Sequence, residues 1–203
     1  HPKNKDFPIV NYTVKKEVII DIFENNLEHI RNAFSEVFDA IYLYKEEKEI
    51  EPLLHVDGAT DLIVGDLSHT LKFNPNGFII IGKQGRGKII KEYIDKKYEG
   101  EVCCRIWDLK GEFDSILEIF TPESNKGKGL EYVANHLGFT RENVIAIGDG
   151  HNDIEMLEYA KIGVCVRNSH PDLFKVADIV LEHTSSENAV YRFLSQFLLN
   201  GNN

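Results

Sequence analysis

Two carboxylates stand directly after a short apolar run in the segment 144–157, which reads VIAIGDGHNDIEML. The apolar residues predict a parallel strand that is buried on both faces and ends at Asp149. Gly148 and Gly150 allow the backbone to turn tightly around that residue, and Asp153 falls in the first turn of a predicted helix, where negative charge is favoured. Ligands bind at the carboxyl ends of strands in open α/β sheets, and carboxylate oxygens suit Mg²⁺. The spacing therefore predicts a magnesium site at this edge.

Asp149 and Asp153 can also be interpreted as turn and capping residues, because Asp is favoured at both places. The complete run Gly-Asp-Gly-x-Asn-Asp is more specific, and it resembles the fourth motif of the haloacid dehalogenase superfamily, whose members are mostly phosphatases. The resemblance implies that Asp149 binds Mg²⁺, that Asn152 contacts a phosphate group and that Asp153 orients the ligands of the metal. His151 occupies a variable position and receives no role.

A second segment, TPESNKGKG at 121–129, precedes apolar residues at helical spacing. It resembles the third motif of the Cof-type branch of the same superfamily, commonly Ser-Lys-Gly-x-Ala-Leu, from which Asn125 and Gly129 depart. The resemblance assigns to Lys126 the neutralisation of phosphoryl oxygens and of an attacking carboxylate. Lys128, two residues further into the helix, is interpreted as a solvated surface charge.

The first motif of the superfamily, Asp-x-Asp-Gly-Thr, has no match among the 203 residues. Its first Asp attacks phosphorus and its second acts as acid and base. The nearest run, HVDGAT at 55–60, has His55 in the nucleophile's place and is predicted to be a polar turn. The second motif, a Ser or Thr that ends another buried strand, is not located either. We expect the nucleophile to lie in an N-terminal core segment of roughly 80 residues outside this chain, by comparison with ordinary two-domain length.

This expectation has a physical consequence for the isolated chain. In such a core the strand at 144–148 pairs with the strand that carries the nucleophile, so its absence would expose an apolar edge. We therefore predict that the chain alone aggregates and does not hydrolyse phosphate esters.

Composition argues against several other classes of protein. The formal net charge is −10, and no basic stripe offsets it, which disfavours nucleic acid as a partner. No apolar stretch approaches the roughly 20 residues that span a bilayer, so no membrane association is expected. Cys103, Cys104 and Cys165 are an odd number of cysteines and are interpreted as reduced packing residues. These features favour a cytoplasmic protein.

The pattern along the chain predicts an α/β fold in two parts, with a boundary near 120–124. Residues 1–122 are predicted to form an α+β cap, with β-rich runs at 40–44, 62–64 and 78–81, a helix at 88–98, and a strand and helix within 9–27. Residues 123–203 are predicted to form the later half of a Rossmann-like parallel-sheet core. Its helices are expected at 128–137, 153–160, 171–176 and 187–199, and its strands at 144–148, 162–166 and 178–181. The last helix is expected to bury five apolar residues: Val190, Phe193, Leu194, Phe197 and Leu198.

A rival motif lies in the first part, where Gly82–Lys88 reads GKQGRGK after an apolar run and satisfies Gly-x4-Gly-Lys. Ile89 stands where a nucleotide-binding P-loop needs Ser or Thr for Mg²⁺, so a glycine-rich turn with solvated cations is favoured. A contact of Lys83 or Arg86 with an anionic substrate is a further hypothesis.

Taken together, these patterns predict a Mg²⁺-dependent phosphatase that acts on small phosphorylated metabolites, sugar phosphates above all. A phosphomannomutase-like phosphotransferase and a non-catalytic binding fragment remain alternatives. The phosphorylation domain of P-type ion pumps also carries Gly-Asp-Gly-x-Asn-Asp, but those proteins continue into membrane helices, whereas soluble alternation follows here.

Overall fold

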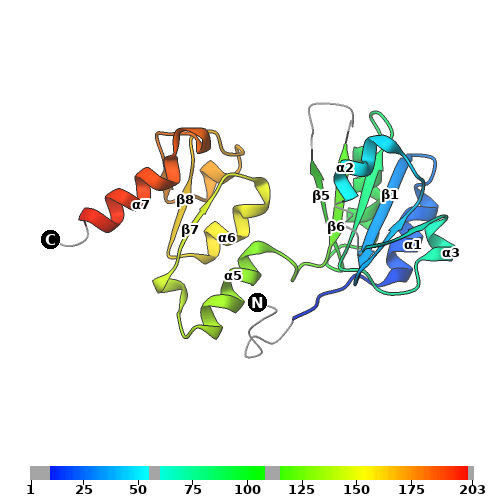
Figure 1. The fold of residues 1–203 in the computed structure, drawn as a ribbon, viewed down its shortest axis with the longest axis horizontal. Coiled ribbons are helices and arrows are strands. Elements are labelled where there is room, and N and C mark those ends of the chain that lie inside the picture. Colours follow the sequence, from blue (N-terminus) through cyan, green and yellow to red (C-terminus); the bar gives the residue numbers. More distant parts are fainter. Residues whose placement is uncertain (1–9, 55–59, 108–114, 201–203) are drawn as a thin grey trace. The chain divides into compact units, whose positions relative to one another are not determined.

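The computed structural model describes residues 10–54, 60–107 and 115–200 of the chain (Figure 1). The predicted polar turn around Asp57 lies outside the described residues. The described residues divide into two compact units, one within residues 10–122 and one within residues 123–200. Each unit is described by itself below.

The first unit is built on a six-stranded sheet of order β3-β2-β1-β4-β6-β5. Its strands are β1 (Ile30–Val37), β2 (Ala40–Leu43), β3 (Asp61–Val64), β4 (Gly77–Gly82), β5 (Cys103–Trp107) and β6 (Ile116–Phe120). Strands β2 and β3 pair in parallel, and all other neighbours pair antiparallel. This mixture of antiparallel strands and helices is the α+β pattern that the sequence predicts.

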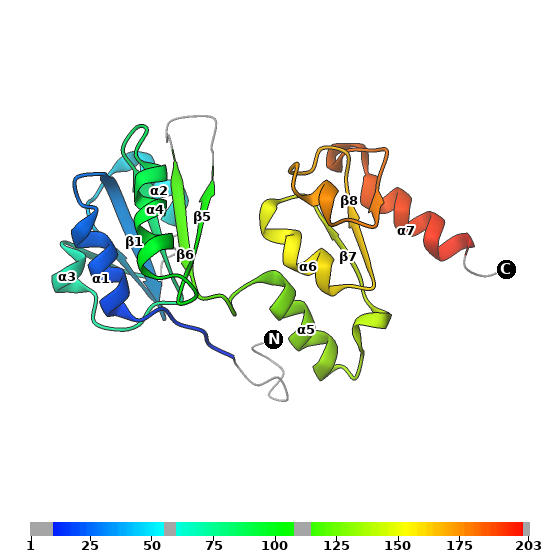
Figure 2. The ribbon, with the colours of Figure 1, turned by 180° about the vertical axis from the view of Figure 1, so that it is seen from behind.

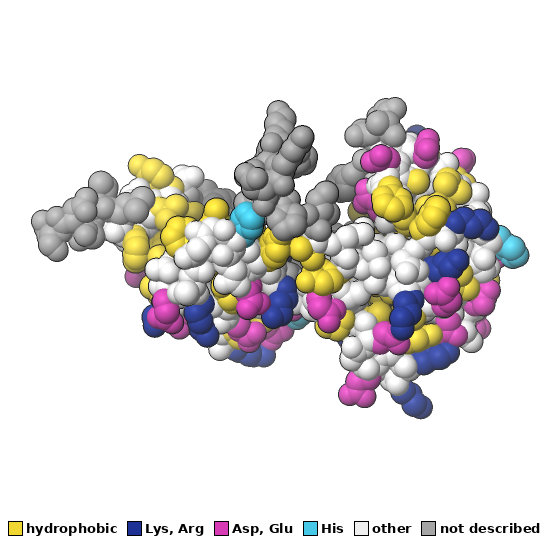
Figure 3. All heavy atoms as spheres, turned by 90° about the horizontal axis from the view of Figure 1, so that it is seen from below, with side chains coloured by type: hydrophobic (Ala, Val, Ile, Leu, Met, Phe, Trp, Pro, Cys, Tyr) yellow, Lys and Arg dark blue, Asp and Glu magenta, His cyan; other side chains and the backbone are white. Residues whose placement is uncertain are grey.

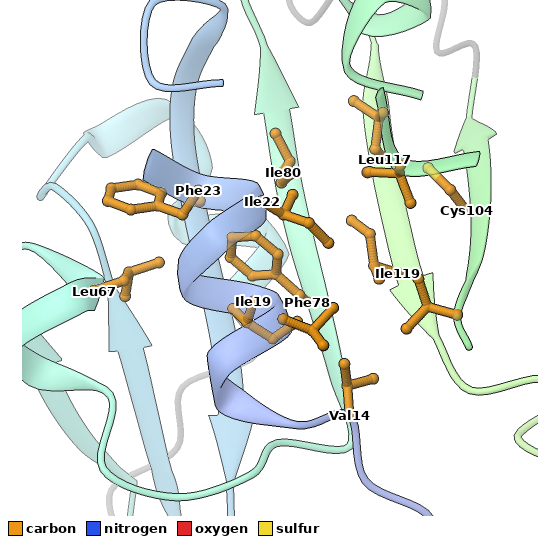
Figure 4. Close-up of a cluster of buried hydrophobic side chains, with 14 of the residues drawn as sticks. Val14, Ile19, Ile22, Phe23, Leu67, Phe78, Ile80, Cys104, Leu117 and Ile119 are labelled. Atoms are coloured by element: carbon orange, nitrogen blue, oxygen red, sulfur yellow. The ribbon is translucent and has the colours of Figure 1, made fainter. Parts of the chain in front are cut away.

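Helices cover both faces of this sheet, because alternate strand residues point to opposite sides. One face of the sheet is covered by three helices, α1 (Lys16–Asn25), α3 (Leu67–Thr70) and α4 (Gly87–Lys97). Their apolar residues pack around the buried Phe78 and Ile80 of β4, as Figures 2 and 4 show. The short turn η1 (Lys48–Ile50) and α2 (Glu51–Leu54) pack on the other face, against Ile81. Residues 78–81 therefore form a continuous apolar run in a central strand.

The second unit has a parallel sheet of order β7-β8-β9. Its strands are β7 (Ile145–Gly148), β8 (Ile162–Cys165) and β9 (Ile179–Val180). They alternate with α5 (Lys126–His136), α6 (Ile154–Tyr159) and α7 (Ala189–Asn200), and with the single 3₁₀ turns η2 (Arg141–Asn143), η3 (His151–Asp153), η4 (Leu173–Lys175) and η5 (Ser185–Glu187). The predicted α/β fold with a parallel sheet in the later part is confirmed.

Several elements differ from the prediction. Residues 10–15 form no strand, and the first helix begins at Lys16. Strands β1 and β5 were not predicted, because Arg31, Asn32 and Arg105 interrupt the apolar alternation that marks a strand. The expected helix at 171–176 contains only the 3₁₀ turn η4.

The predicted burial of the last helix was wrong. The exposed fractions are 41% for Val190, 40% for Leu194 and 47% for Phe197, and Phe193 is only partly buried. Leu198 lies outside the residues whose side chains are described. Helical spacing shows that apolar residues share one face, but it does not show that another element covers that face. Figure 3 shows apolar side chains on the surface of this unit near its C-terminal end.

The cysteines lie in apolar surroundings. Cys104 and Cys165 are buried and Cys103 is partly buried, and none forms a disulfide within the described residues. Burial raises the pKa of the Cys104 thiol to about 12, which makes it unreactive at neutral pH. No helix in the described ranges is both long and apolar enough to cross a membrane.

Candidate functional site

Asp149 stands immediately after strand β7, at the carboxyl end of the parallel sheet. It is exposed, and its carboxylate accepts no hydrogen bond from any part of the chain that the structure describes. Its backbone is fixed on both sides: its carbonyl oxygen accepts from the amide of His170 at 2.8 Å, and its amide donates to Asp153 at 3.0 Å. The turn therefore holds an unpaired carboxylate at the sheet edge where ligands bind.

Asp153 fixes this turn from the start of helix α6. Its side chain is only 6% exposed, and Oδ2 accepts from the amides of Asp149 at 3.0 Å and Gly150 at 2.9 Å. The carboxylate fits because position 148 has no side chain: a β-carbon at Gly148 would lie 2.8 Å from Cγ of Asp153. The glycine before Asp149 is thus required by close packing rather than by an unusual backbone angle.

Lys126 is the first residue of helix α5, and its Nζ contacts Oδ1 of Asp153. The helix begins here because the side chain of Asn125 accepts a hydrogen bond from the amide of Lys128 at 2.8 Å, which is an N-cap. Gly127 lies against the backbone of Glu155 in α6. The two predicted segments, 27 residues apart at these positions, therefore meet in one charged pair within the second unit.

The hydrogen-bond partners of Asp153 keep its carboxyl group ionised. Burial alone would raise the pKa of this carboxyl, but the hydrogen bonds from Lys126 and from the amides of Gly150 and Asp149 outweigh burial and lower the pKa. Asp153 is therefore an anion at neutral pH whose oxygens are already occupied, whereas the carboxylate of Asp149 is available to a ligand.

A family model for haloacid dehalogenase-like hydrolases matches residues 2–194. The chain belongs to this hydrolase family. The family predicted from the two short motifs is therefore confirmed over nearly the whole length of the chain.

Two relatives of this chain are named as phosphatases. The 5-amino-6-(5-phospho-D-ribitylamino)uracil phosphatase YitU of Bacillus subtilis (strain 168) is 26% identical over 200 residues, which are 97% of this chain and 72% of YitU. A phosphoglycolate phosphatase of Methanothermobacter thermautotrophicus is 38% identical over 81 residues, which are 38% of this chain and 37% of the relative. The second match is local.

Solved structures share the fold of this hydrolase. SMU.1108c of Streptococcus mutans UA159 aligns with a TM-score of 0.75 at 20% identity, over 94% of this chain and 71% of the other. The subclass IIB sugar phosphatase BT4131 aligns with a TM-score of 0.70 at 15% identity, over 93% and 68% of the two chains. At these identities the likeness shows the fold alone.

The oxygen donors of the hydrolase at this edge fit Mg²⁺ in part. Asp149 offers a free carboxylate, and Mg²⁺ in phosphate-binding sites commonly takes only one or two carboxylates, completing its shell with water and substrate oxygens. The described residues contain no group of three or more His, Cys, Asp and Glu side chains that could hold a metal by themselves. Asp149 would therefore be a single protein ligand of the metal, and Asp153 would support it through the backbone of the turn.

Two other residues singled out in the sequence, Asn152 and Lys128, lie on η3 and α5. Asn152 is partly buried in η3, and its Oδ1 would lie 2.7 Å from a β-carbon on Gly150. Its contact with phosphate stays a prediction. Lys128 is exposed on α5 and pairs there with Glu131 at 2.8 Å.

The segment after β8 also reaches this edge, although no functional role is predicted for it from the sequence. Ser169 Oγ lies 3.4 Å from the carbonyl oxygen of Gly148, and the His170 and His151 rings meet edge to face with centroids 5.1 Å apart. The signal was present, because residues that follow adjacent parallel strands gather at the same sheet edge.

Proposed function

We propose that this chain belongs to a Mg²⁺-dependent enzyme that hydrolyses phosphate monoesters of small metabolites. The observation that carries the proposal is the pairing of Lys126 with Asp153 beside the free carboxylate of Asp149 at the end of β7. An ammonium group and a metal-binding carboxylate at one strand end suit the stabilisation of a phosphoryl group, on which negative charge is spread over several oxygens.

In the proposed reaction a carboxylate from polypeptide outside these 203 residues attacks phosphorus. The new carboxyl oxygen–phosphorus bond forms as the bond from phosphorus to the ester oxygen breaks, and the leaving alkoxide takes a proton from an acid. Water then attacks phosphorus and gives a proton back to the group that had acted as the acid. The bond from phosphorus to the carboxyl oxygen breaks, which restores the carboxylate and releases inorganic phosphate. Bound Mg²⁺ would neutralise phosphoryl oxygens and orient the group for in-line attack.

The residues of this chain have separate tasks in that scheme. Lys126 neutralises a phosphoryl oxygen, Asn152 donates a hydrogen bond to another, and Asp149 would hold the metal. Asp153 positions the other groups, because it fixes both the Lys126 ammonium and the turn that carries Asp149. Residues 9–122 are proposed to be the cap that selects the substrate.

The relatives support a phosphorylated metabolite as substrate. YitU is named for a phosphorylated ribitylaminouracil, the archaeal relative for phosphoglycolate, and BT4131 for sugar phosphates. These names share a phosphate ester on a small organic molecule, and sugar phosphates or related metabolites are therefore the proposed class.

The test is phosphate release from a panel of sugar phosphates by the protein that contains these residues together with the rest of its open reading frame. We expect Asp149→Asn to abolish Mg²⁺-dependent turnover and Lys126→Ala to raise KM and lower kcat together. Glu158→Gln, which removes an exposed charge from α6, serves as the matched control and should leave both constants unchanged. Unchanged kinetics in Asp149→Asn would refute the assigned role.

The same panel separates the alternatives. A phosphomannomutase-like phosphotransferase would interconvert hexose 1-phosphate and hexose 6-phosphate without net release of phosphate. A non-catalytic protein would do neither, although it would still bind the esters.

A further inference from the structure

The turn between β4 and α4 has the features of an anion site in the first unit. Helix α4 has eleven residues, and Arg86 at its N-cap position makes no side-chain cap. The amides of Gly87 and Lys88, at the first turn, donate no hydrogen bond to any residue of the described ranges. Unpaired amides at a helix N-terminus carry partial positive charge.

A second and independent feature lies beneath this turn. Ser115, immediately before β6, is only 5% exposed, and its hydroxyl has no hydrogen-bond partner within the described part of the chain. The hydroxyl points into the junction of β4 and α4: a β-carbon on Gly82 would lie 2.8 Å from Ser115 Oγ, and one on Gly87 would lie 2.7 Å from Ser115 Cβ. A buried hydroxyl without a partner is unfavourable unless a ligand or water supplies one.

The charged residues of the turn itself, residues 83–88, are all cations. Lys83, Arg86 and Lys88 are exposed, and the first turn of α4 contains no acidic residue. Lys83 Nζ donates to the carbonyl oxygen of Glu28 at 2.7 Å, which holds it beside the turn. In a chain with a formal net charge of −10, three cations within six residues are a local exception.

We propose that this junction binds a phosphoryl oxyanion. The donors are the amides of Gly87 and Lys88, the hydroxyl of Ser115 and the guanidinium of Arg86. Ile89 supplies no hydroxyl for a metal, so the ligand is a phosphate group without a bound Mg²⁺, unlike that of a P-loop. The site lies wholly within residues 9–122 and does not depend on the proposed function.

The inference is tested by an NMR titration of the protein with inorganic phosphate, at an ionic strength kept constant with sodium chloride. We expect saturable shifts of the Gly87 and Lys88 amides. Ser115→Ala, which deletes a hydroxyl without a partner and should not lower stability, is expected to weaken phosphate binding about tenfold, the effect of losing about 1.4 kcal/mol. Arg86→Ala should weaken it by at least as much.

Two controls make the test specific. Lys96→Ala removes one exposed cation from the opposite end of α4 and should leave the affinity unchanged. Lys126→Ala should likewise leave the shifts at Gly87 intact, which separates this site from the one at β7. A parallel titration with glucose 6-phosphate shows whether the site takes free phosphate or a phosphate ester.

Shifts confined to residues 126–153, or an equal loss of affinity in Lys96→Ala and Arg86→Ala, would overturn the proposal. So would an unchanged affinity in Ser115→Ala. Shifts confined to residues 126–153 would place phosphate only at the β7 edge. Equal losses in Lys96→Ala and Arg86→Ala would reduce the effect to general electrostatic attraction.

Discussion

The backbone of Gly127 in α5 lies so close to Glu155 in α6 that a β-carbon at position 127 would be 2.6 Å from the carbonyl carbon of Glu155. The neighbouring atoms belong to a helix backbone and cannot rotate away. This close approach of α5 to α6 brings Lys126, one residue earlier, to Asp153, two residues before Glu155. The absence of a side chain at Gly127 thus allows the two motifs of the candidate site to come into contact.

Gly127→Ala is expected to separate these helices. The added methyl group should lower the free energy of unfolding by about 1–3 kcal/mol, the usual cost of overpacking, and reduce turnover because Lys126 moves. Gly129→Ala is the matched control, since nothing lies within 4 Å of a β-carbon there, and alanine should stabilise the helix by about 1 kcal/mol. Urea denaturation measures both, and equal effects of the two substitutions would contradict the assignment.

The stability of the second unit should depend on pH through Asp153. Its pKa in the folded protein is lowered against its value of about 3.9 in an unfolded chain, because the bonds from Lys126 and two amides outweigh burial. A lowered folded pKa contributes stability that is present above about pH 4 and is lost as pH falls through the folded pKa.

Asp153→Asn should therefore lower the free energy of unfolding by about 1–3 kcal/mol at pH 7, the range for a buried hydrogen-bonded charge. The difference from the natural protein should shrink below pH 4. Denaturation at a series of pH values measures it, with Glu158→Gln as an exposed control. A difference that stays constant down to pH 2 would show that Asp153 contributes by shape alone.

The sequence was sufficient where local chemistry decides the structure. The apolar run 78–81, the alternation after residue 123 and the glycines around Asp149 each predict their element from nearest neighbours. It was insufficient where partners distant in the chain decide. Strand β5 forms because Cys104 and Ile106 pack against the core from an edge position, and the packing of Gly127 on α6 has no local signature. The spacing of apolar residues on α7 predicted which residues share one face, but it did not predict that this face is exposed.

The stability of the first unit should depend on the hydrogen bonds that Asp21 of α1 accepts from residues of α4 and its C-terminal end. Its carboxylate accepts from Tyr98 Oη at 2.6 Å, Tyr93 Oη at 2.7 Å and Lys97 Nζ at 2.8 Å. Burial would raise the pKa of Asp21, but these donors lower it. We expect Tyr98→Phe to cost about 1 kcal/mol of stability alone and almost nothing in an Asp21→Ala background.

A double-mutant cycle in urea measures that coupling. Tyr191→Phe, at a tyrosine that is 73% exposed in the second unit, should show no coupling to Asp21. Additive effects of Asp21→Ala and Tyr98→Phe would mean that the hydrogen bond contributes nothing to folding.

The exposed face of α7 should make the isolated 203-residue chain self-associate. Val190, Leu194 and Phe197 follow at intervals of four and three residues and so share one side of the helix, and each is at least 40% exposed. The only charged residue of α7 is Arg192, so little opposes contact between apolar faces.

Leu194→Lys places a charge in the centre of that face and should lower light scattering and dye binding several-fold. Because Leu194 is already 40% exposed, the free energy of unfolding should change by less than about 1 kcal/mol. Gln196→Lys adds the same charge at an exposed polar position of the helix and should leave scattering nearly unchanged. An equal fall in both variants would assign the effect to net charge, because only the first alters the apolar face.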